Sequence, residues 1–333
     1  MSRFLFWRLV WAALLAFVVA SGGLVLARLA GGDYITQTLG LGARRDTIER
    51  LREAEGLDRP LLQQYGDWLS GAARLDFGES RLYQRPVGSL VVARTINSSV
   101  LALGALLLGL LVGLPLGIVS GSRRAGALRH LVRTVSVVCL SVPPLVGSLL
   151  LVWMAAVTGL FPIGGMTSTG SADASTAAWL GDVLWHLPVP VLALGLPLAA
   201  MLERVQSQAI SEALAQPCIA AAVARGASRE RALWKHALRL SAKTPIAIGG
   251  LMAGVLLSGS FAVELVTSWP GLGRLTYEAL VARDVALVAG CATAGALLVS
   301  SGLVLSDVLL VLADPRTSSI DGSPLAAGGI ARP

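Results

Sequence analysis

Apolar residues fill most of this chain in long blocks that short polar segments separate. Six blocks approach or exceed the roughly 20 residues that a helix needs to cross the hydrocarbon core of a bilayer. A chain segment inside lipid must satisfy its own backbone hydrogen bonds, so each block is expected to be a helix. The pattern predicts an all-α polytopic membrane protein with six transmembrane helices, at about Phe4–Leu29, Thr95–Gly121, Leu131–Leu160, Trp185–Met201, Pro245–Val266 and Val285–Leu312.

The polar segments divide the chain into parts. Residues 1–30 form the first transmembrane helix, and 31–94 form an extracytoplasmic segment expected to make short helices on the outer membrane surface. Residues 95–313 form a core of five transmembrane helices that contains a cytoplasmic loop at 204–243. The tail at 314–333 is rich in Gly, Ser and Pro, and we expect it to be disordered.

Composition supports a membrane protein. Of the 333 residues, 54% are hydrophobic and 14% are charged, whereas a soluble domain carries about 25% charged residues. The net charge of +7 does not indicate nucleic-acid binding, because the cations lie in a few short loops. The three cysteines have no spacing that suggests a disulfide. A cleaved signal peptide is an alternative for the first block, whose apolar run exceeds the usual 7–15 residues.

The loop charges predict the orientation. Segment 122–133 holds four arginines and no acid, and 204–243 holds seven cations, whereas 161–184 holds no cation. By the positive-inside rule, the two basic loops and both termini face the cytoplasm. This is a multi-pass protein of the cytoplasmic (inner) membrane in that interpretation.

Several kinds of chemistry lack their residues. Neither of the two lysines, Lys235 and Lys243, follows the glycine of a phosphate-binding loop, so ATP binding by such a loop is excluded. The three histidines have no zinc-like spacing, and we expect no metal site and no cofactor on this chain. Gly226-Ala227-Ser228 is similar to the Gly-x-Ser stretch of intramembrane serine proteases, but it lies in a basic loop. A helix end at Gly226 and a helix start at Ser228 explain it better.

Two carboxylates lie in or near the spans. Glu264 is close to the outer end of the fifth block and Asp307 is close to the inner end of the last one. Ionisable groups there usually face protein or a cavity, so a pathway role and a structural role both stay open for Glu264. Asp307 is expected to pair with a loop arginine. A proton-coupled secondary transporter would need central carboxylates or histidines, which the spans do not clearly provide.

Small residues recur at helical spacing in two spans. They are Gly109, Gly113 and Gly117 in the second span and Gly250 and Gly254 in the fifth. Such faces let helices approach closely in lipid, so we interpret them as helix-packing positions. A mobile seam beside a transport pathway is the alternative.

A small basic segment, residues 219–239, interrupts this apolar chain. Pro217 suits the first turn of a helix, Gly226 would end that helix, and Ser228 would begin another. The alanines would let a partner approach the backbone, and the cations around them would meet an acidic rim. The segment is therefore predicted to be a docking element rather than a solvated loop.

The segment resembles the cytoplasmic EAA loop of binding-protein-dependent ABC permeases of the dipeptide, oligopeptide and nickel group. Ala222-Val223-Ala224-Arg225-Gly226-Ala227-Ser228 and Lys235-His236-Ala237-Leu238-Arg239 fit that loop, and the resemblance extends from residue 1 to about 317. Further matching stretches are Leu57-Asp58-Arg59-Pro60, Asp76-Phe77-Gly78, Arg85-Pro86-Val87, Ser268-Trp269-Pro270-Gly271-Leu272-Gly273-Arg274, Ala282-Arg283-Asp284 and Asp314-Pro315-Arg316. Departures are Ala220 in place of the glutamate, Leu75 in place of a glycine, missing prolines near Gly31 and a late Pro245.

The resemblance implies a permease subunit of the type I ABC importer kind, without enzymatic activity of its own. Its partners would be a second permease subunit, two cytosolic ATPase subunits that carry ATP and Mg, and an extracytoplasmic solute-binding protein. The ATPase contacts would be Ala221, Ala222, Arg225, Gly226, Ser228 and Arg229. Pathway or gating positions would be Glu264, Trp269, Pro270 and Asp307. Dipeptide, oligopeptide, nickel, metallophore and glutathione all stay open as the solute.

Overall fold

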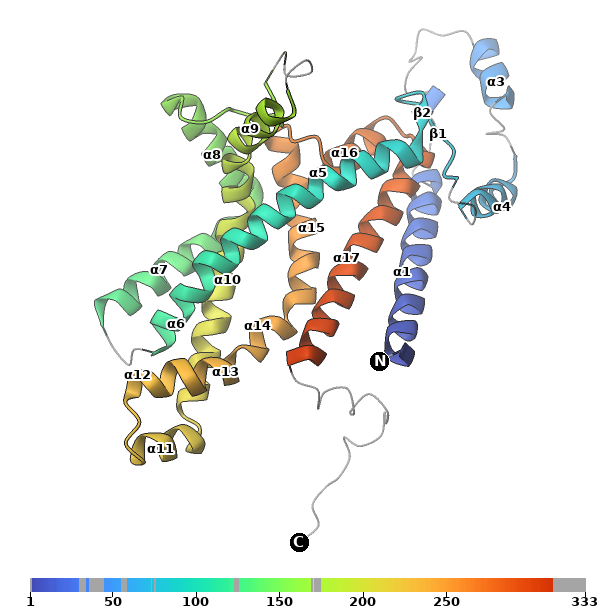
Figure 1. Ribbon diagram of the computed structural model, residues 1–333. Helices are drawn as coiled ribbons and strands as arrows, with labels where there is room; N and C mark the ends of the chain where they lie inside the picture. Colours follow the sequence, from blue (N-terminus) through green and yellow to red (C-terminus); the bar gives the residue numbers. More distant parts are fainter. Residues whose placement is uncertain are drawn as a thin grey trace.

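The computed structural model of this chain describes residues 2–29, 34–35, 45–54, 59–72, 74, 76–122, 126–168, 170 and 175–313. Helices dominate it, and Figure 1 shows the long ones running between two ends of the molecule that each carry shorter helices. The predicted all-α membrane fold is confirmed. The predicted disorder of 314–333 falls outside the described residues.

Among the residues that the structure describes, five helices are long and apolar enough to cross a membrane. They are α1 (Ser2–Leu29), α5 (Val87–Leu108) with its continuation, α10 (Pro188–Leu214), α15 (Gly249–Val266) and α17 (Val285–Ala313). The continuation of α5 is a π-helical turn, η2 (Gly109–Gly113), followed by α6 (Leu114–Ser122). A sixth span is counted when α7 (Ala127–Ser141) and α8 (Pro144–Thr158) are taken together.

The third predicted span is broken rather than straight. The axes of α7 and α8 meet at 101°. Val142 and Pro143 between them are extended, with ψ of 114° and 145°. Consecutive prolines remove backbone donors and disfavour a helical conformation for the preceding residue, which explains the break. By contrast, Pro197 lies inside α10 and does not interrupt it.

The boundaries of three predicted spans differ from the structure. The second span begins at Val87 rather than Thr95, because the helix continues outward past Arg94, a charged residue at which the predicted span was ended. The fourth span is α10, which begins at Pro188 and continues to Leu214 instead of ending at Met201. Pro245 belongs to a separate short helix, α14 (Lys243–Ala247), and α15 begins after it.

Short elements gather at the two ends. One end carries α3 (Arg45–Ala54), α4 (Leu61–Ala72), α9 (Thr176–His186) and α16 (Leu272–Val281). It also carries an antiparallel pair, β1 (Glu79–Ser80) and β2 (Arg85–Pro86), in which Ser80 faces Arg85. The other end carries α11 (Pro217–Ala224), α12 (Arg229–Ala232), a π-helical turn η4 (Leu233–Ala237), α13 (Leu238–Ser241) and α14.

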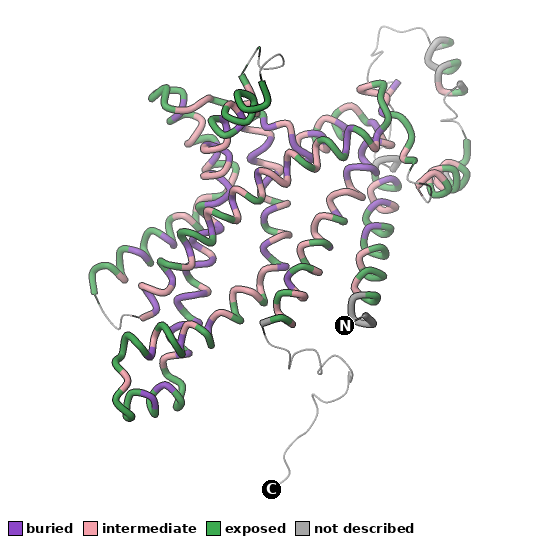
Figure 2. The backbone as a smooth tube through the Cα atoms, viewed as in Figure 1, coloured by how far each residue is buried: buried purple, intermediate pink, exposed green. Residues whose placement is uncertain are grey.

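Helix α10 is the centre of the packing. It contacts α5, α6, α7, α8 and α15, and its buried residues recur along its whole length (Figure 2). Helix α1 packs mainly on α17 and exposes large apolar side chains such as Phe6, Trp7 and Trp11. Exposed apolar surface of this extent fits contact with lipid.

The glycines of the second span bring it close to α10. A Cβ atom added to Gly113 or Gly117 would lie less than 3.0 Å from atoms of α10, and one added to Gly109 would lie 3.1 Å from Leu198. Gly250 meets Leu303 of α17 in the same way. Gly254 differs from the prediction, because a Cβ there would meet nothing within 4 Å among the described residues. Gly254 is therefore not a helix-packing position within the described part of this subunit.

Candidate functional site

Residues 217–239, which we name the coupling loop, lie at the end of the molecule that also holds the start of α1 (Figure 1). Helix α11 begins with Pro217 at its first position, where the missing N–H has no helical partner to lose. Ile219 and Ala222 face inward and are buried. Ala221 and Val223 are exposed, so the helix presents an outward face of small apolar side chains.

Backbone caps shape the turn between α11 and α12. Gly226 has φ of +92°, and its N–H donates to the carbonyl of Val223 at 2.9 Å. The N–H of Ala227 donates to the carbonyl of Ala222 at 3.1 Å. Ser228 then begins α12, and its hydroxyl oxygen accepts from the N–H of Arg231 at 3.2 Å. The predicted helix end at Gly226 and helix start at Ser228 are confirmed, and they account for Gly226-Ala227-Ser228 without catalysis.

A small core joins the coupling loop to α10. Ala213, Ile219, Ala232 and Ala237 pack together, with 5% or less of each side chain exposed. Beside this core lies a groove of about 690 Å³ between α11, α12 and the ends of α6, α7 and α10. The coupling loop is thus attached to the central helix of the subunit through four small or medium side chains.

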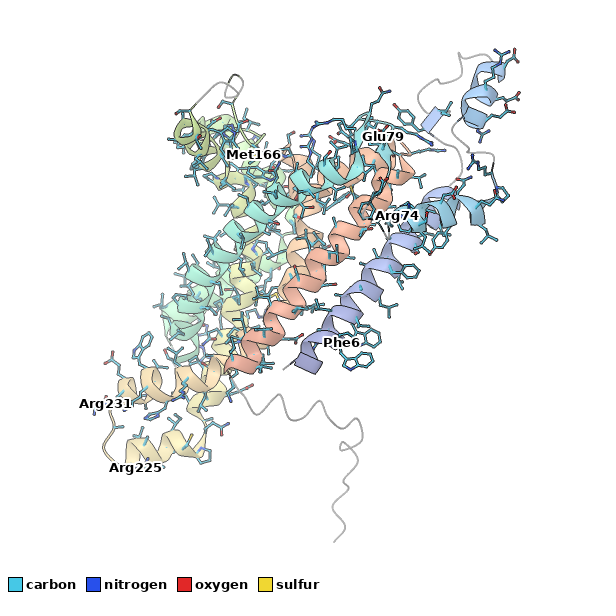
Figure 3. All side chains as sticks on the ribbon, turned by 45° about the vertical axis from the view of Figure 1, so that its right-hand side comes forward. Phe6, Arg74, Glu79, Met166, Arg225 and Arg231 are labelled. Carbon is cyan, nitrogen blue, oxygen red and sulfur yellow. The ribbon has the colours of Figure 1, made fainter. Side chains whose placement is uncertain are left out.

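The structure separates the predicted docking residues into two groups. Ala221, Arg225, Ser228 and Arg229 are exposed, and Figure 3 shows Arg225 and Arg231 at the extreme end of the molecule. Ala222 is 7% exposed and faces its own chain, so its methyl group is not available to a partner. Ala222 was chosen because the alanines are consecutive, whereas the helical period of 3.6 residues places Ala222 on the same inward face as Ile219.

Two exposed apolar residues were missed in the coupling loop. Val223 is 44% exposed on α11 and Trp234 is 55% exposed on η4. Trp234 lies beside Lys235 and His236, which are also exposed. A tryptophan inside a basic loop is a sequence signal for a contact surface, because aromatic side chains are enriched where proteins bind each other.

At the opposite end, Glu264 of α15 is fully buried and does not face solvent. Its Oε1 accepts from the hydroxyl of Ser98 at 2.6 Å, and its Oε2 accepts from the N–H groups of Gly273 and Arg274 at 2.7 and 3.1 Å. These two N–H groups begin α16, where a negative charge is favoured by the helix dipole. Glu264 therefore fixes the start of α16 to α15 and α5.

The loop before α16 is tied to α5 as well. The indole of Trp269 is fully buried and donates to the carbonyl of Asn97 at 3.0 Å. The side-chain amide of Asn97 donates to the carbonyl of Pro270 at 2.8 Å, and the N–H of Leu272 donates to Ser98 Oγ at 2.7 Å. Glu264 and Trp269 are thus internal anchors in this structure, rather than exposed lining of a pathway.

Glycines make room for the buried carboxylate. A Cβ on Gly273 would lie 2.9 Å from Glu264 Oε2 and 2.7 Å from the Cα of Phe261. A Cβ on Gly271 would overlap the same carboxyl group. Glycine is therefore required at positions 271 and 273, because the start of α16 packs directly against the carboxyl group of Glu264 from α15.

Asp307 of α17 pairs with α1. Its Oδ2 lies 2.9 Å from the guanidinium Nη2 of Arg8, and both side chains are partly exposed. Arg8 lies in a helix, so this ion pair is additional to the pairing with a loop arginine that the sequence suggested.

Asp284 and Glu278 form a second anchor at the outer end, which the sequence analysis missed. Asp284 is buried, and it accepts from the hydroxyl of Ser80 at 2.8 Å and from the N–H groups of Leu82 and Leu287. The hydroxyl of Tyr83 donates to Glu278, and burial together with this carboxylate raises the pKa of Tyr83 to about 12. The sequence did contain a signal for this role: Asp284 directly precedes a long apolar run, and aspartate is favoured at helix N-caps.

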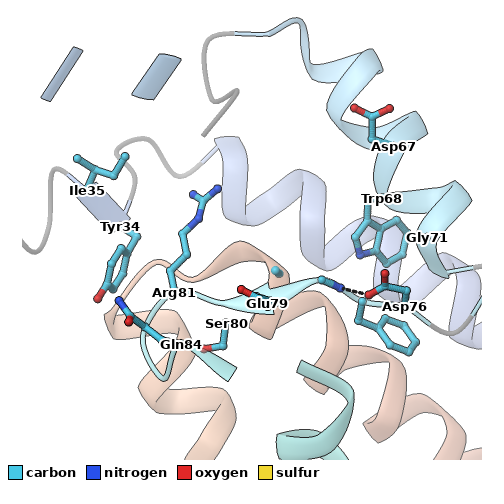
Figure 4. Close-up of a pocket in the computed structure, with 13 residues that line it drawn as sticks. Tyr34, Ile35, Asp67, Trp68, Gly71, Asp76, Glu79, Ser80, Arg81 and Gln84 are labelled. Carbon is cyan, nitrogen blue, oxygen red and sulfur yellow. Dashed lines mark hydrogen bonds between the residues drawn. The ribbon is translucent and has the colours of Figure 1, made fainter. Parts of the chain in front are cut away.

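A pocket of about 930 Å³ opens between α4, the β1–β2 pair and the start of α17 (Figure 4). Trp68 and Tyr34 supply aromatic side chains, and Asp67, Asp76 and Glu79 supply carboxylates. Asp76 Oδ1 accepts from the N–H of Gly78 at 2.9 Å, which shapes the turn at its edge.

Glu203 is a third buried carboxylate that the apolar pattern did not reveal. It lies in α10 beyond the predicted end of the span at Met201, and 1% of its side chain is exposed. Its Oε1 accepts from the hydroxyl of Ser120 at 2.5 Å. Among the described residues, no cluster of three or more His, Cys, Asp and Glu side chains could hold a metal ion.

Comparison with known proteins agrees with this architecture. Residues 113–319 match the family described as binding-protein-dependent transport system inner membrane component. The oligopeptide transport system permease protein AppB of Bacillus subtilis is 31% identical over 88% of this chain and 92% of its own length. A putative peptide transport system permease protein of Brucella abortus is 31% identical over 95% of this chain and 99% of its own.

A third relative, the oligopeptide transport system permease protein OppB of Mycobacterium tuberculosis, is 35% identical over 78% of this chain and 82% of its own length. These relatives cover 78%, 88% and 95% of the chain, and the family match covers α10, most of the helices that pack around it, and the coupling loop. The resemblance inferred from the sequence motifs is confirmed. The chain is a multi-pass membrane permease and belongs to the family of inner membrane components of binding-protein-dependent transport systems.

Proposed function

We propose that this chain is one of two transmembrane subunits of an ATP-driven importer for peptides or related small solutes. The three relatives are named as permeases of peptide or oligopeptide transport systems, which supports the solute class. Cytosolic ATPase subunits would bind the coupling loop, and an extracytoplasmic binding protein would deliver the solute to the other end. The chain itself would bind no ATP.

The observation that carries this proposal is the construction of the coupling loop. Helix α11 turns its small exposed side chains away from the membrane helices and its buried ones toward α10. A partner could approach the α11 backbone closely, while Arg225, Arg229 and Arg231 would meet acidic groups around it. A loop needed only for solvation would not require an inward core and an outward small-residue face.

Movement of the ATPase subunits would reach the pathway through α10. The small core ties α11 and α12 to α10, and α10 contacts most of the other spans. A push on α11 would therefore shift the central helix rather than only the loop. Inward-facing and outward-facing states would then differ in their contacts with the ATPase, which is what coupling requires.

The outer end would receive the solute-binding protein. Glu264 and Asp284 anchor α16 and the β1–β2 pair, so this surface would keep its shape while the spans move. The acidic and aromatic pocket lies beside these anchored elements. Both termini and the coupling loop would face the cytoplasm.

Uptake into proteoliposomes tests the proposal. The purified permease pair and ATPase subunits would be reconstituted with external binding protein and internal ATP, and labelled dialanine and trialanine would be offered. ATP-dependent accumulation of either peptide is expected. Accumulation of a metal ion or metallophore instead, with no peptide uptake, would contradict the peptide assignment.

Orientation has its own test. Single cysteines at Ala178 of α9 and at Arg229, in a protein whose three native cysteines are replaced, should react with a membrane-impermeant maleimide from opposite sides of the membrane. Ala178 should react from outside. Reaction of both from one side would contradict the arrangement of the spans.

A further inference from the structure

A further pocket lies between α7 and α10, two helices that belong to the candidate membrane spans. We name it the α7–α10 pocket; its volume is about 220 Å³, and it is lined by Arg133, Val137, Glu203, Arg204, Ser207 and Gln208. It is separate from the coupling loop and from the outer anchors. Arg133, Arg204 and Gln208 are exposed at its edge, whereas Glu203 and Ser207 are buried.

Two buried polar atoms in this pocket wall have no partner. Glu203 Oε2 and Ser207 Oγ form no hydrogen bond, although 1% and 4% of their side chains are exposed. The other carboxylate oxygen of Glu203, Oε1, accepts one hydrogen bond, from the neutral hydroxyl of Ser120. Removing a carboxylate from water is strongly unfavourable unless a cation or several donors replace the water.

The pocket supplies opposite charges at different depths. Arg129 of α7 and Leu214 of α10 line one groove, so the start of α7 lies beside the end of α10 and the helices are antiparallel. Ser207 and Gln208 lie about 6 Å closer to the α11 end of α10 than Glu203, at the helical rise per residue. Arg133 is one turn closer to that end than Val137. The carboxylate is therefore deep, and Arg133 is shallow.

From these contacts we infer that the α7–α10 pocket binds a zwitterionic solute, with its ammonium group at Glu203 and its carboxylate at Arg133. No ion pair joins Glu203 to Arg133 or Arg204 in the part of the chain that the structure describes, so both charges are available. An ammonium group supplies the donors that the carboxylate lacks, and the guanidinium binds a carboxylate through two N–H groups.

The volume of the α7–α10 pocket and the order of its two charges along the helices indicate which solute fits. A volume of about 220 Å³ is below the roughly 300–1,000 Å³ of sites for larger ligands, so it suits a dipeptide or one end of a longer peptide. A phosphatidylethanolamine headgroup would enter with its phosphate nearer the membrane interior than its ammonium group. That order is opposite to the order of Arg133 and Glu203. The order of charges therefore fits a peptide rather than this lipid, and this inference rests on the proposed peptide transport.

The experiment measures equilibrium binding of labelled dialanine to the assembled permease–ATPase complex in phosphatidylglycerol nanodiscs, without binding protein. Wild-type complex should bind dialanine and should bind N-acetyl-dialanine and dialanine amide about tenfold more weakly, as expected when a charged hydrogen bond is lost. Glu203→Gln should bind the free and N-acetylated peptides equally. Arg133→Gln should bind the free peptide and its amide equally. The exposed Glu53→Gln serves as the control and should behave as wild type.

Each other outcome overturns the inference. Equal binding of the three peptides to wild type, or unchanged preferences in Glu203→Gln, would leave Glu203 as a structural residue. Displacement of dialanine by added phosphatidylethanolamine, dependent on Glu203, would make the pocket a lipid site. Thermal unfolding of each variant shows whether it is folded, and the conservative Glu203→Asp should regain part of the preference. Wild-type uptake of peptide in proteoliposomes separates this failure from failure of the proposed function.

Discussion

At the outer end, α16 is fixed by side chains from other elements, whereas at the inner end α11 and α12 are fixed mainly by their own backbone. Glu264, Ser98 and Asn97 reach the start of α16 from α15 and α5. The coupling loop has Gly226 and Ser228 as local caps and a core of four side chains. The outer anchors include bonds between residues more than 160 positions apart, such as Ser98 and Glu264, whereas the inner caps join only neighbours.

This difference corresponds to two mechanical roles. Buried charged hydrogen bonds hold one geometry, because breaking any of them leaves an unpaired group in a low-dielectric environment. A loop held by caps and a small core can be displaced or reordered at lower cost. A transporter that receives a soluble protein on one side and a moving ATPase on the other would use a rigid outer surface and a more adaptable inner one.

Glu264→Ala is expected to have the largest effect. It leaves the hydroxyl of Ser98 and the N–H groups of Gly273 and Arg274 without their acceptor, so the free energy of unfolding should fall by about 3–5 kcal/mol. Thermal unfolding of the purified subunit and its yield after size-exclusion chromatography measure the change. Glu264→Gln keeps a carbonyl oxygen for the two N–H groups and should be clearly milder. Equal stability of both variants and wild type would contradict the anchor role.

The sequence predicted the inner end better than the outer end, because the contacts that shape the inner end are local in the chain. The bounds of α11 and the start of α12 follow from Pro217, Gly226 and Ser228, which act on their immediate neighbours. Six apolar blocks likewise predicted the spans, because hydropathy is a local property. The break between α7 and α8 was foreseeable from Pro143 and Pro144, although its angle of 101° was not.

What the sequence could not provide depends on distant pairs. The position of Glu264 was noted, yet nothing local shows that its partners are Ser98 and the start of α16. Glu203 was missed because charged residues lowered the hydropathy and moved the predicted end of the span to Met201. Ala222 was assigned to the wrong face because the orientation of α11 is set by its core with α10.

The next largest effect comes from substitutions that distinguish the inward face of α11 from its outward face. Ala222→Trp inserts a large side chain into the inward face and should destabilise the coupling loop by about 1–3 kcal/mol, as overpacking does. Ala221→Trp adds the same side chain to the exposed face, so the stability of the subunit should stay within about 0.5 kcal/mol of wild type. Both variants should lose co-purifying ATPase. Wild-type co-purification of Ala221→Trp would show that the outward face is not the docking surface.

Gly226→Val tests the turn that orients the two faces. Its φ of +92° is unfavourable for a residue with a side chain, and the strain should cost roughly 1–2 kcal/mol. Limited proteolysis should cut the coupling loop faster while the spans remain folded. Gly254→Ala is the matched control, since an added Cβ there meets no described atom within 4 Å. Equal proteolysis of Gly226→Val and wild type would show that the loop tolerates another turn.

Arg229→Ala should have the smallest effect and sharpens the distinction between shape and charge. Arg229 is exposed, and an exposed ion pair with a partner contributes only about 0–1 kcal/mol. Co-purification of ATPase should therefore fall by no more than about fivefold at low salt and should match wild type at high salt, where exposed charges are screened. Ala221→Trp should lose the ATPase at both salt concentrations, because a steric clash is not screened. A salt-independent loss of the ATPase in Arg229→Ala would mean that this side chain is buried in the complex. The docking surface would then extend from the small face of α11 onto the start of α12.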